Sequence, residues 1–411
     1  MAGGVWCMYV LGAGVRLWLM NSSGASVIAK RVEFSTPLNS WKRVEEGVFL
    51  YSQGIPVYSG GVFHETPLCL LISSFLIRSW RAYLPLLFVA CDLLTAALLA
   101  AVAASYGKKQ LIEQKKNVDK YSVDSLPLLL TSESLWSGVV CVSAVYLFCP
   151  YTIASCVAQT TTVFDNLVLA AVLAAMVRGY PILFGGLVAV ATYQSFYPVC
   201  LLVPGIISLV QDKNSTSALL KPLLSFAVSF GLLMMVSVEV AGSWEFLEAT
   251  YGFILAAPDL TPNIGLFWYF FTEMFEHFRL FFLATFQINA FVYVLPLSIR
   301  LRRDPVLLAT ALLAFTAGLQ ELPVTGQLMR QTFIVGCMFV STSVLGPIMY
   351  NLWIFSGSAN ANFYFAVTLA FNTAQIFLVT DLLFAYVKWE YQLTHGSKVE
   401  VDGGPGRLTL Q

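Results

Sequence analysis

The chain has 411 residues, of which 58% are hydrophobic and 11% are charged, and its mean hydropathy is +0.74. So few polar residues cannot cover a soluble globule of this size, which excludes a soluble enzyme and indicates a polytopic membrane protein. The net charge of zero offers no basic surface for nucleic acid. The eight cysteines occur singly, without CxxC or Cys/His spacing, so we expect buried inert thiols, no metal site and no cofactor.

The N-terminal part starts with an apolar run, residues 5–20. No basic residue precedes this run and no small-residue cleavage site follows it, so it predicts an uncleaved first span rather than a signal peptide. Residues 21–65 are the longest polar stretch, and we expect a loop there. The next apolar run, 68–77, is too short to cross a hydrocarbon core of about 30 Å, so it predicts a broken or a re-entrant helix.

Charge and hydropathy organise the rest of the chain. Five lysines in residues 107–124 predict a cytosolic loop. Residues 243–257 combine aromatic and aliphatic side chains with Glu245 and Glu248, which indicates an amphipathic segment on the membrane surface. The remaining apolar runs are 83–105, 135–150, 163–177, 182–197, 199–210, 219–241, 279–297, 306–319, 333–355 and 363–387. Together they predict an all-α polytopic membrane protein with about 11 transmembrane helices, within a range of about 10 to 12.

Charged residues inside the expected spans are candidates for function, because an unpaired charge in hydrocarbon is costly. Their scatter over separate spans favours pairing between helices, or a place at a helix end, over a proton relay. These residues are Arg16, Asp92, Asp165, Glu239 and Asp381.

The sequence PDLTPNIGLFWYFFTEMFEHF, residues 258–278, is where we expect recognition to take place. Its two prolines cannot continue a helix, because proline lacks an amide donor. Backbone left open among membrane spans must line a cavity or lie at the interface. We expect Asn263 to cap a helical run that starts at Gly265. The alternative is an interfacial aromatic belt with Glu273 and Glu276 directed at lipid headgroups.

Several segments resemble the PIG-U family, the multispanning subunit of the glycosylphosphatidylinositol (GPI) transamidase. They are STPLNSWKRVEEG at 35–47, YSGGVFHETPL at 58–68, ATYQSFYP at 191–198, PDLTPNIGLFWYFF at 258–271, GSANANF at 357–363 and YQLTHG at 391–396. The resemblance implies an endoplasmic reticulum complex that removes a C-terminal signal peptide and attaches a GPI lipid. Within it, this subunit would handle the lipid, with the other subunits as partners.

The resemblance also implies a single membrane domain, 1–411, in which the loop 21–65 and the segment 243–278 are lumenal. A short C-terminal tail, 388–411, would complete it. Between Arg303 and Gln331 the chain is shorter than the family pattern by about one helix, judged against the roughly 20 residues that a span needs.

We expect no catalytic residue in this chain. A transamidase needs an activated cysteine with a positioned histidine, and no cysteine and histidine here share a suitable soluble segment, so another subunit must supply them. The alternative is a lipid-dependent mannosyltransferase of GT-C type, which the fold and the YSGGVFHETPL region also resemble. Such enzymes carry a DxD motif in the first lumenal loop, whereas here Glu33 stands alone and Glu45 and Glu46 are adjacent. A transporter is a third class, but no internal repeat supports it.

We expect the lipid's polar head to lie between residues 258–278 and GSANANF. Asparagine offers a donor and an acceptor without a charge, and aromatic faces suit the boundary between sugar and hydrocarbon. His64 and Glu65 are adjacent and so point apart, which favours binding or capping over an acid/base pair. The alternative for the asparagines of GSANANF is a turn or cap role. The residues expected to bind lipid are Asn263, Phe267, Trp268, Tyr269, Asn360, Asn362, His64 and Glu65.

Overall fold

The computed structural model is helical almost throughout. It describes residues 2–213, 216–256, 258–317, 326–396, 400–401 and 404–405. The strands in these ranges are one short antiparallel pair, β1 (Glu400–Val401) with β2 (Gly404–Pro405). The chain folds as two compact units: unit 1 is Met1–Val102 with Ser143–Gln320, and unit 2 is Ala103–Val142 with Glu321–Gln411. Because almost all of the described secondary structure is helical, the prediction of an all-α fold is confirmed.

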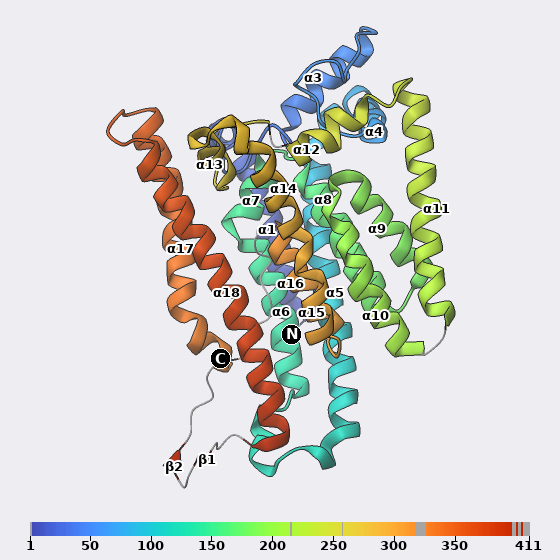
Figure 1. Cartoon of the computed structure of the whole chain (residues 1–411), viewed down its shortest axis with the longest axis vertical. Coiled ribbons are helices and arrows are strands. Elements are labelled where there is room, and N and C mark those ends of the chain that lie inside the picture. Colours follow the sequence, from blue (N-terminus) through green and yellow to red (C-terminus); the bar gives the residue numbers. More distant parts are fainter. Residues whose placement is uncertain are drawn as a thin grey trace. The chain divides into compact units, whose positions relative to one another are not determined.

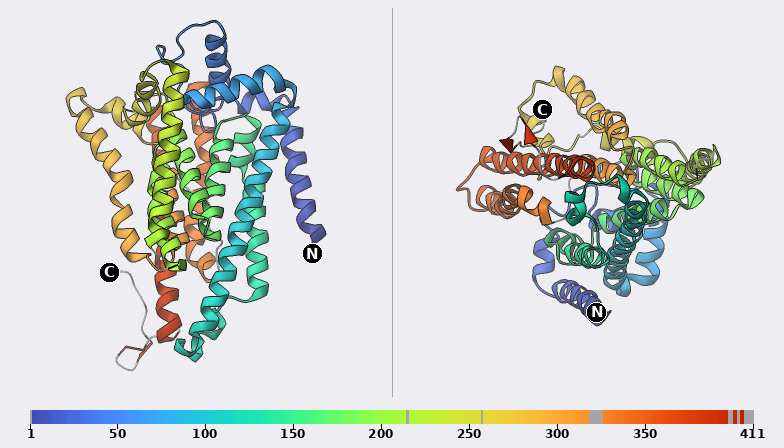
Figure 2. Two further views of the ribbon diagram at one scale, coloured as in Figure 1. Left: turned by 90° about the vertical axis from the view of Figure 1, so that its right-hand side faces the viewer. Right: turned by 90° about the horizontal axis from the view of Figure 1, so that it is seen from below.

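Unit 1 is a helical bundle with shorter elements at one end (Figure 1). Its own helices are α1 (Ala2–Met20), α2 (Gly24–Ile28), α3 (Trp41–Ser52), α4 (Pro67–Trp80), α7 (Pro150–Val157), α8 (Thr162–Arg178), α9 (Pro181–Ser195), α10 (Leu202–Lys213), α11 (Thr216–Ala241), α12 (Phe253–Ala256), α13 (Phe267–Glu273), α14 (Glu276–Val292), α15 (Val294–Arg300) and α16 (Pro305–Ala317). Both Figure 1 and the left view of Figure 2 place α3 at the end of the unit to which α1 delivers the chain.

Proline and glycine explain several helix boundaries. Pro67, Pro150 and Pro181 stand in the first turn of α4, α7 and α9, where the missing amide is not needed. Gly179 ends α8 in the left-handed conformation, at φ 74°, and its amide donates to the Met176 carbonyl.

Five helical stretches of the described chain are long and apolar enough to cross a membrane. They are Pro67–Lys120, Val123–Phe148, Thr216–Ala241, Ile334–Ile354 and Ala361–His395. Shorter apolar helices cover Gly4–Met20, Pro181–Ser195 and Tyr197–Gln211. The count of about 11 spans and the likeness to the GT-C fold stay predictions. The expected run 306–319 lies partly outside the described residues, which stop at 317 before resuming at 326.

Two helices extend further than the sequence predicts, and one expected helix break is confirmed. The lysine-rich stretch 107–124 is not a loop throughout, because α5 (Leu84–Asn117) continues through its first part. Lysine, glutamine and leucine are strong helix formers, so a helix that leaves the apolar region continues. α18 (Ala361–His395) likewise extends into the expected tail. The short run 68–77 belongs to a broken helix, since α4 continues through a 3-10 turn, Arg81–Tyr83, into α5.

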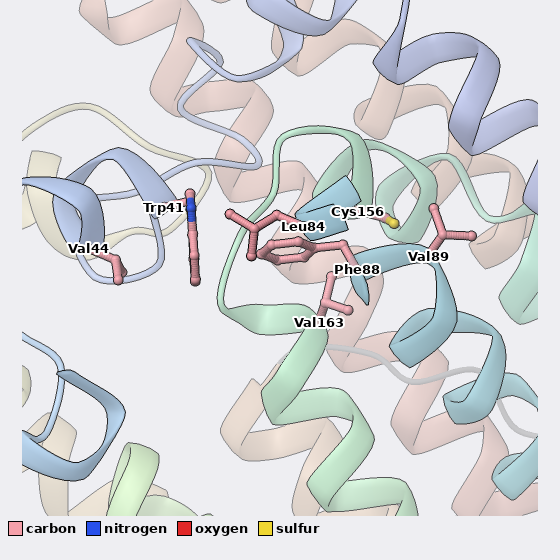
Figure 3. Packing of buried hydrophobic residues seen from close by; sticks show 7 residues of the cluster. All are labelled: Trp41, Val44, Leu84, Phe88, Val89, Cys156 and Val163. Carbon is pink, nitrogen blue, oxygen red and sulfur yellow. The ribbon is translucent and has the colours of Figure 1, made fainter. Parts of the chain in front are cut away.

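A cluster of buried side chains attaches α3 to the bundle (Figure 3). Trp41 packs edge-on against Phe88 of α5, with ring centroids 5.2 Å apart at 89°. Phe88 in turn lies 4.9 Å from Phe164 of α8, and Val163 completes the contact. Large aromatic rings bury much apolar surface, so Trp41 fixes the polar segment 21–65 to the bundle end.

Unit 2 contains a hairpin of two long helices and the short turns that pack on it. α17 (Gly326–Ile354) and α18 lie side by side in Figures 1 and 2. The rings of Phe339 and Phe371 stack between them at 5.0 Å. Near the end of α18 the Leu393 carbonyl accepts from the Ser122 amide, 2.9 Å away. The unit also includes parts of α5 and of α6 (Ser132–Phe148), since its boundaries fall inside both helices.

Candidate functional site

Residues 258–266, the central turn, are non-helical and held by their own side chains. Asp259 Oδ1 accepts from the Thr261 amide at 3.0 Å and from its hydroxyl at 2.6 Å. Asn263 Oδ1 accepts from the Gly265 amide at 2.8 Å, and its Nδ2 donates to the Thr261 carbonyl at 3.2 Å. These are Asx turns, in which a short polar side chain replaces backbone partners. Thus Asn263 stabilises the turn itself, and the expectation that it caps the following helix is wrong.

The aromatic run after the turn forms two helices rather than one. α13 starts at Phe267, and the extended backbone of Met274 and Phe275 separates it from α14. Phe267 packs edge-on against Phe286 of α14, with centroids 5.0 Å apart. The Arg279 guanidinium lies 5.4 Å from the centroid of the Phe271 ring. Aromatic side chains therefore pack α13 against α14, and some of them also face outward.

The three aromatic residues expected to flank acyl chains differ in exposure. Phe267 is 48% exposed, Trp268 is 4% exposed and Tyr269 is intermediate. Trp268 packs edge-on against Tyr269 at 5.4 Å. Of these three residues, Phe267 is the most exposed, with about half of its surface open to the outside.

His64 connects the loop before α4 to the segment that leads into the central turn. Its Nδ1 lies 2.8 Å from the Ala249 carbonyl, and its ring stacks on Phe253 of α12 at 3.6 Å. A carbonyl only accepts, so Nδ1 carries the proton. Nε2 is buried and has no hydrogen-bond partner among the described residues. The Gly61 backbone favours the charged form of the ring and so raises the pKa of His64, but it forms no hydrogen bond with Nε2.

The charge state of His64 follows from this environment. Burial is the main influence and lowers the pKa of His64, while the hydrogen bond to Ala249 opposes the shift and Arg43 reinforces it. The Asp259 carboxylate of the central turn raises the pKa slightly, so His64 and the turn lie within range of each other's charge. The ring is therefore neutral at neutral pH, and its Nε2 is buried without a hydrogen bond among the described residues.

Glu65 has a different surrounding from its neighbour. Its backbone carbonyl accepts from the Tyr58 hydroxyl at 3.1 Å. Burial, with a contribution from the Asp165 carboxylate, raises the pKa of Glu65 to about 8, and the Thr161 hydroxyl partly opposes this. Glu65 is therefore largely protonated at neutral pH.

Stability should depend on pH through Glu65. Its folded pKa of about 8 exceeds the ordinary 4.5, so the folded state binds more protons between these values. The stabilisation is complete below about pH 4.5 and is lost as the pH rises through 8. We expect Glu65→Gln to flatten the dependence of the thermal midpoint between about pH 5.5 and 8.5. Midpoints of the purified complex, with Glu46→Gln as an exposed control, measure this; equal slopes for Glu65→Gln and the parent would contradict it.

Unit 2 holds the remaining residues expected to bind lipid. Asn360 is the N-cap of α18, with its Oδ1 accepting from the Phe363 amide at 3.1 Å. Asn360 and Asn362 are both exposed. Gly357 has φ 62°, which a residue with a side chain seldom adopts. The cap role of Asn360 is thus present, whereas a joint site of the asparagines with the central turn stays a prediction.

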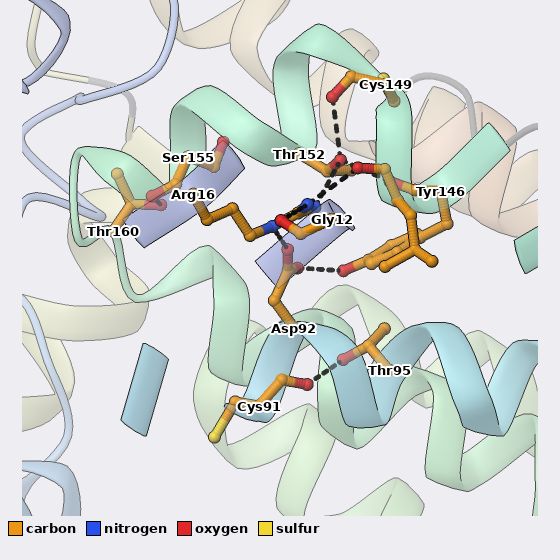
Figure 4. Close-up of polar contacts among 11 residues, drawn as sticks. Gly12, Arg16, Cys91, Asp92, Thr95, Tyr146, Cys149, Thr152, Ser155 and Thr160 are labelled. Atoms are coloured by element: carbon orange, nitrogen blue, oxygen red, sulfur yellow. Dashed lines mark hydrogen bonds and ion pairs between the residues drawn. The ribbon is translucent and has the colours of Figure 1, made fainter. Parts of the chain in front are cut away.

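A buried ion pair joins α1 and α5 (Figure 4). Arg16 Nε donates to Asp92 Oδ2 at 2.5 Å, and the two side chains are 0% and 1% exposed. The Tyr146 hydroxyl donates to the other carboxylate oxygen at 2.8 Å. Pairing between helices, expected for charged residues in spans, is confirmed for Arg16 and Asp92.

The same network supplies hydrogen-bond donors to the carbonyls at the break between α6 and α7. Pro150 has no amide, so the Tyr146 carbonyl loses its helical donor, and the Thr152 hydroxyl donates to it at 2.6 Å. Arg16 Nη1 donates to the next carbonyl, Leu147, at 2.8 Å, and to Gly12 of its own helix at 3.1 Å. The helix break and the charged pair therefore satisfy one another.

The structure adds Gln287 of α14, which the sequence patterns did not single out. Its amide bonds Tyr197 and two carbonyls of α12, Ile254 and Leu255. It also borders a shallow, open depression of about 390 Å³ together with Ile288, Phe291 and Val292, all on α14. The signal was an amide inside an apolar run, since such groups bond neighbouring helices.

Carboxylates of the first loop do not form a pair. Glu33 is 9% exposed, and burial raises its pKa. Glu45 lies 3.8 Å from Arg81, and Glu46 is exposed. No group of three His, Cys, Asp or Glu side chains suited to a metal ion occurs within the described ranges.

Long apolar helices interrupted by polar turns define a multi-pass α-helical membrane protein. The family model described as GPI transamidase subunit PIG-U matches residues 10–371, and the chain belongs to this family. The GPI-anchor transamidase component PIGU of Homo sapiens is 38% identical over 439 residues, covering all of both chains. The GPI transamidase component GAB1 of Saccharomyces cerevisiae is 31% identical over 380 residues, 88% of each. The Schizosaccharomyces pombe GAB1 homolog is 28% identical over 400 residues, 92% of each.

The motif-based resemblance is thereby confirmed. The relatives are components of the GPI transamidase, so the chain is a subunit of that complex and has the other subunits as partners.

Proposed function

We propose that this subunit binds the GPI lipid in the endoplasmic reticulum membrane and presents it for attachment to the C-terminus of precursor proteins. The proposal rests on the structure of the central turn in a chain that is a GPI transamidase subunit. It is a polar, non-helical segment stabilised by Asp259 and Asn263 and placed between apolar helices. Irregular backbone among spans belongs where it meets a polar ligand or water.

His64 supports a polar contact beside this turn. Its bare Nε2 can accept a hydrogen bond from a sugar hydroxyl or an amine of the lipid head. A buried acceptor without a donor is costly, so a ligand that supplies one gains binding energy. Asn360 and Asn362 of unit 2 would contact the same head, and Phe267 would lie at its boundary with the acyl chains.

The subunit is proposed to be non-catalytic, with the cysteine and histidine of the transamidase in another chain. The first loop presents Glu33, Glu45 and Glu46 in unlike surroundings: one is buried, one lies beside Arg81 and one is exposed. This arrangement gives no support to a carboxylate pair of the mannosyltransferase kind.

Two substitutions of His64 separate ligand binding from structure. Asparagine reaches the position of Nδ1 and keeps the bond to Ala249, whereas glutamine reaches the position of Nε2. We expect His64→Asn to leave assembly intact and to reduce crosslinking of a photoreactive GPI to the complex by about tenfold. His64→Gln should lower stability by about 1 kcal/mol and keep more crosslinking.

Quantitative crosslinking on equal amounts of assembled complex is the measurement. If His64→Asn crosslinks like the parent while His64→Gln does not, the histidine has a structural role alone and does not contact the lipid.

A further inference from the structure

We infer that Gln287 is a positioning residue that fixes how the chain enters the central turn, and that Tyr197, which follows a strained residue, Phe196, orients its amide. The inference rests on the proposed function only in naming lipid binding as the outcome. It concerns residues that lie together in unit 1.

Gln287 supplies donors that the end of α12 lacks. In a continuing helix the Ile254 carbonyl would accept from residue 258, but Pro258 has no amide. Gln287 Nε2 donates instead to the Leu255 carbonyl at 3.0 Å and to the Ile254 carbonyl at 3.4 Å. α14 is thereby bonded to the chain three residues before the turn begins.

The orientation of this amide is set by Tyr197. The Tyr197 hydroxyl donates to Gln287 Oε1 at 2.8 Å. A flipped amide would place Oε1 against two carbonyls, acceptor against acceptor, and would leave the tyrosine without its acceptor. The hydroxyl and the two carbonyls therefore select one orientation of the amide.

Tyr197 reaches Gln287 because the preceding residue has a strained backbone. Phe196 has φ 63° and ψ −54°, close to the γ-turn geometry that is rare for residues with a side chain. Its ring packs against Phe291 of α14 at 5.9 Å and against Tyr251 at 6.3 Å. The Tyr251 hydroxyl donates to the Tyr193 carbonyl at 2.7 Å.

Strain of this kind persists only where the surroundings impose it. Here the surroundings are the end of α9, the π-helical turn Glu248–Gly252 and α14. The hydrogen bonds of Tyr197 and Tyr251 connect these three elements. Gln287 in turn bonds α14 to the Leu255 carbonyl, shortly before Pro258.

The test uses the complete complex with Gln287→Leu, which keeps most of the volume and removes the amide. We expect crosslinking of a photoreactive GPI to fall about tenfold, and the amides of Thr261 and Gly265 to exchange with deuterium about tenfold faster. Both amides donate within the central turn. Gln287→Glu should behave like leucine at pH 8 and recover partly at pH 5.5, where a protonated carboxyl can again donate.

Thr285→Val is the matched control. Thr285 is exposed on the same helix, and its hydroxyl donates to the Phe281 carbonyl of that helix at 2.8 Å. It should change neither readout. If Gln287→Leu does not assemble, Tyr197→Phe replaces it, with an expected loss of about threefold in crosslinking.

Unchanged exchange at Thr261 and Gly265 in an assembled Gln287→Leu complex would overturn the inference. If the parent complex itself does not crosslink GPI, the proposed function fails. The exchange rates still decide the role of Gln287 in that case.

Discussion

Replacing Arg16 by methionine is expected to lower the free energy of unfolding by about 3–5 kcal/mol. The change leaves the Asp92 carboxylate buried without its cation and removes the donor to the Leu147 carbonyl at the helix break. Both groups are away from water, so neither finds a substitute partner. Thermal denaturation of the purified complex, followed by the loss of assembled subunit, measures the effect.

An exposed ion pair in the described part of the chain provides a matched control. Arg81 and Glu45 are 3.8 Å apart, with side chains 74% and 39% exposed. Arg81→Gln should therefore change stability by at most about 0.5 kcal/mol. The double variant Arg16→Met with Asp92→Leu should recover much of the loss, because no unpaired charge remains. Equal effects of Arg16→Met and Arg81→Gln would show that the buried pair is no more important than the exposed one.

Asn360→Lys is expected to abolish most GPI attachment while the complex still assembles. A long cation at this exposed position would fill the space proposed for the lipid head, next to Gly357 and the start of α18. Loss of the cap alone costs about 1 kcal/mol and acts through stability. Crosslinking of photoreactive GPI to the assembled complex, together with cell-surface display of a GPI-anchored reporter, measures the two consequences.

Two variants at the same position separate the cap from the ligand. Asn360→Ser keeps a hydroxyl acceptor for the Phe363 amide and should leave attachment nearly unchanged if the cap is what matters. Asn360→Ala loses the acceptor but adds no bulk. Undiminished crosslinking to an assembled Asn360→Lys complex would remove Asn360 from the proposed site.

The sequence by itself determined the class of protein and its family. Apolar runs long enough for a bilayer are properties of composition and spacing, so they could be recognised without coordinates. Local signals were equally informative where the partner is close along the chain. The N-cap of α18 at Asn360 follows from such a signal, because a cap and its amide are three residues apart.

Local patterns failed where two local partners compete. Asn263 could cap a helix or close a turn, and only the backbone path selected the turn with Gly265. The extent of α5 beyond the apolar region was also missed, because hydropathy marks where a membrane ends and not where a helix does.

Tertiary structure alone decided which distant groups meet. Arg16 could have paired with any acid in a span, and it is the packing of α1 against α5 and the break at Pro150 that give it Asp92 and the Leu147 carbonyl. Gln287 is a single amide in an apolar run, and its importance depends on two carbonyls 32 and 33 residues away, one of which, that of Ile254, has lost its helical donor to Pro258. The energy of a buried polar group depends on its partner, and a linear sequence does not specify that partner until the helices have packed.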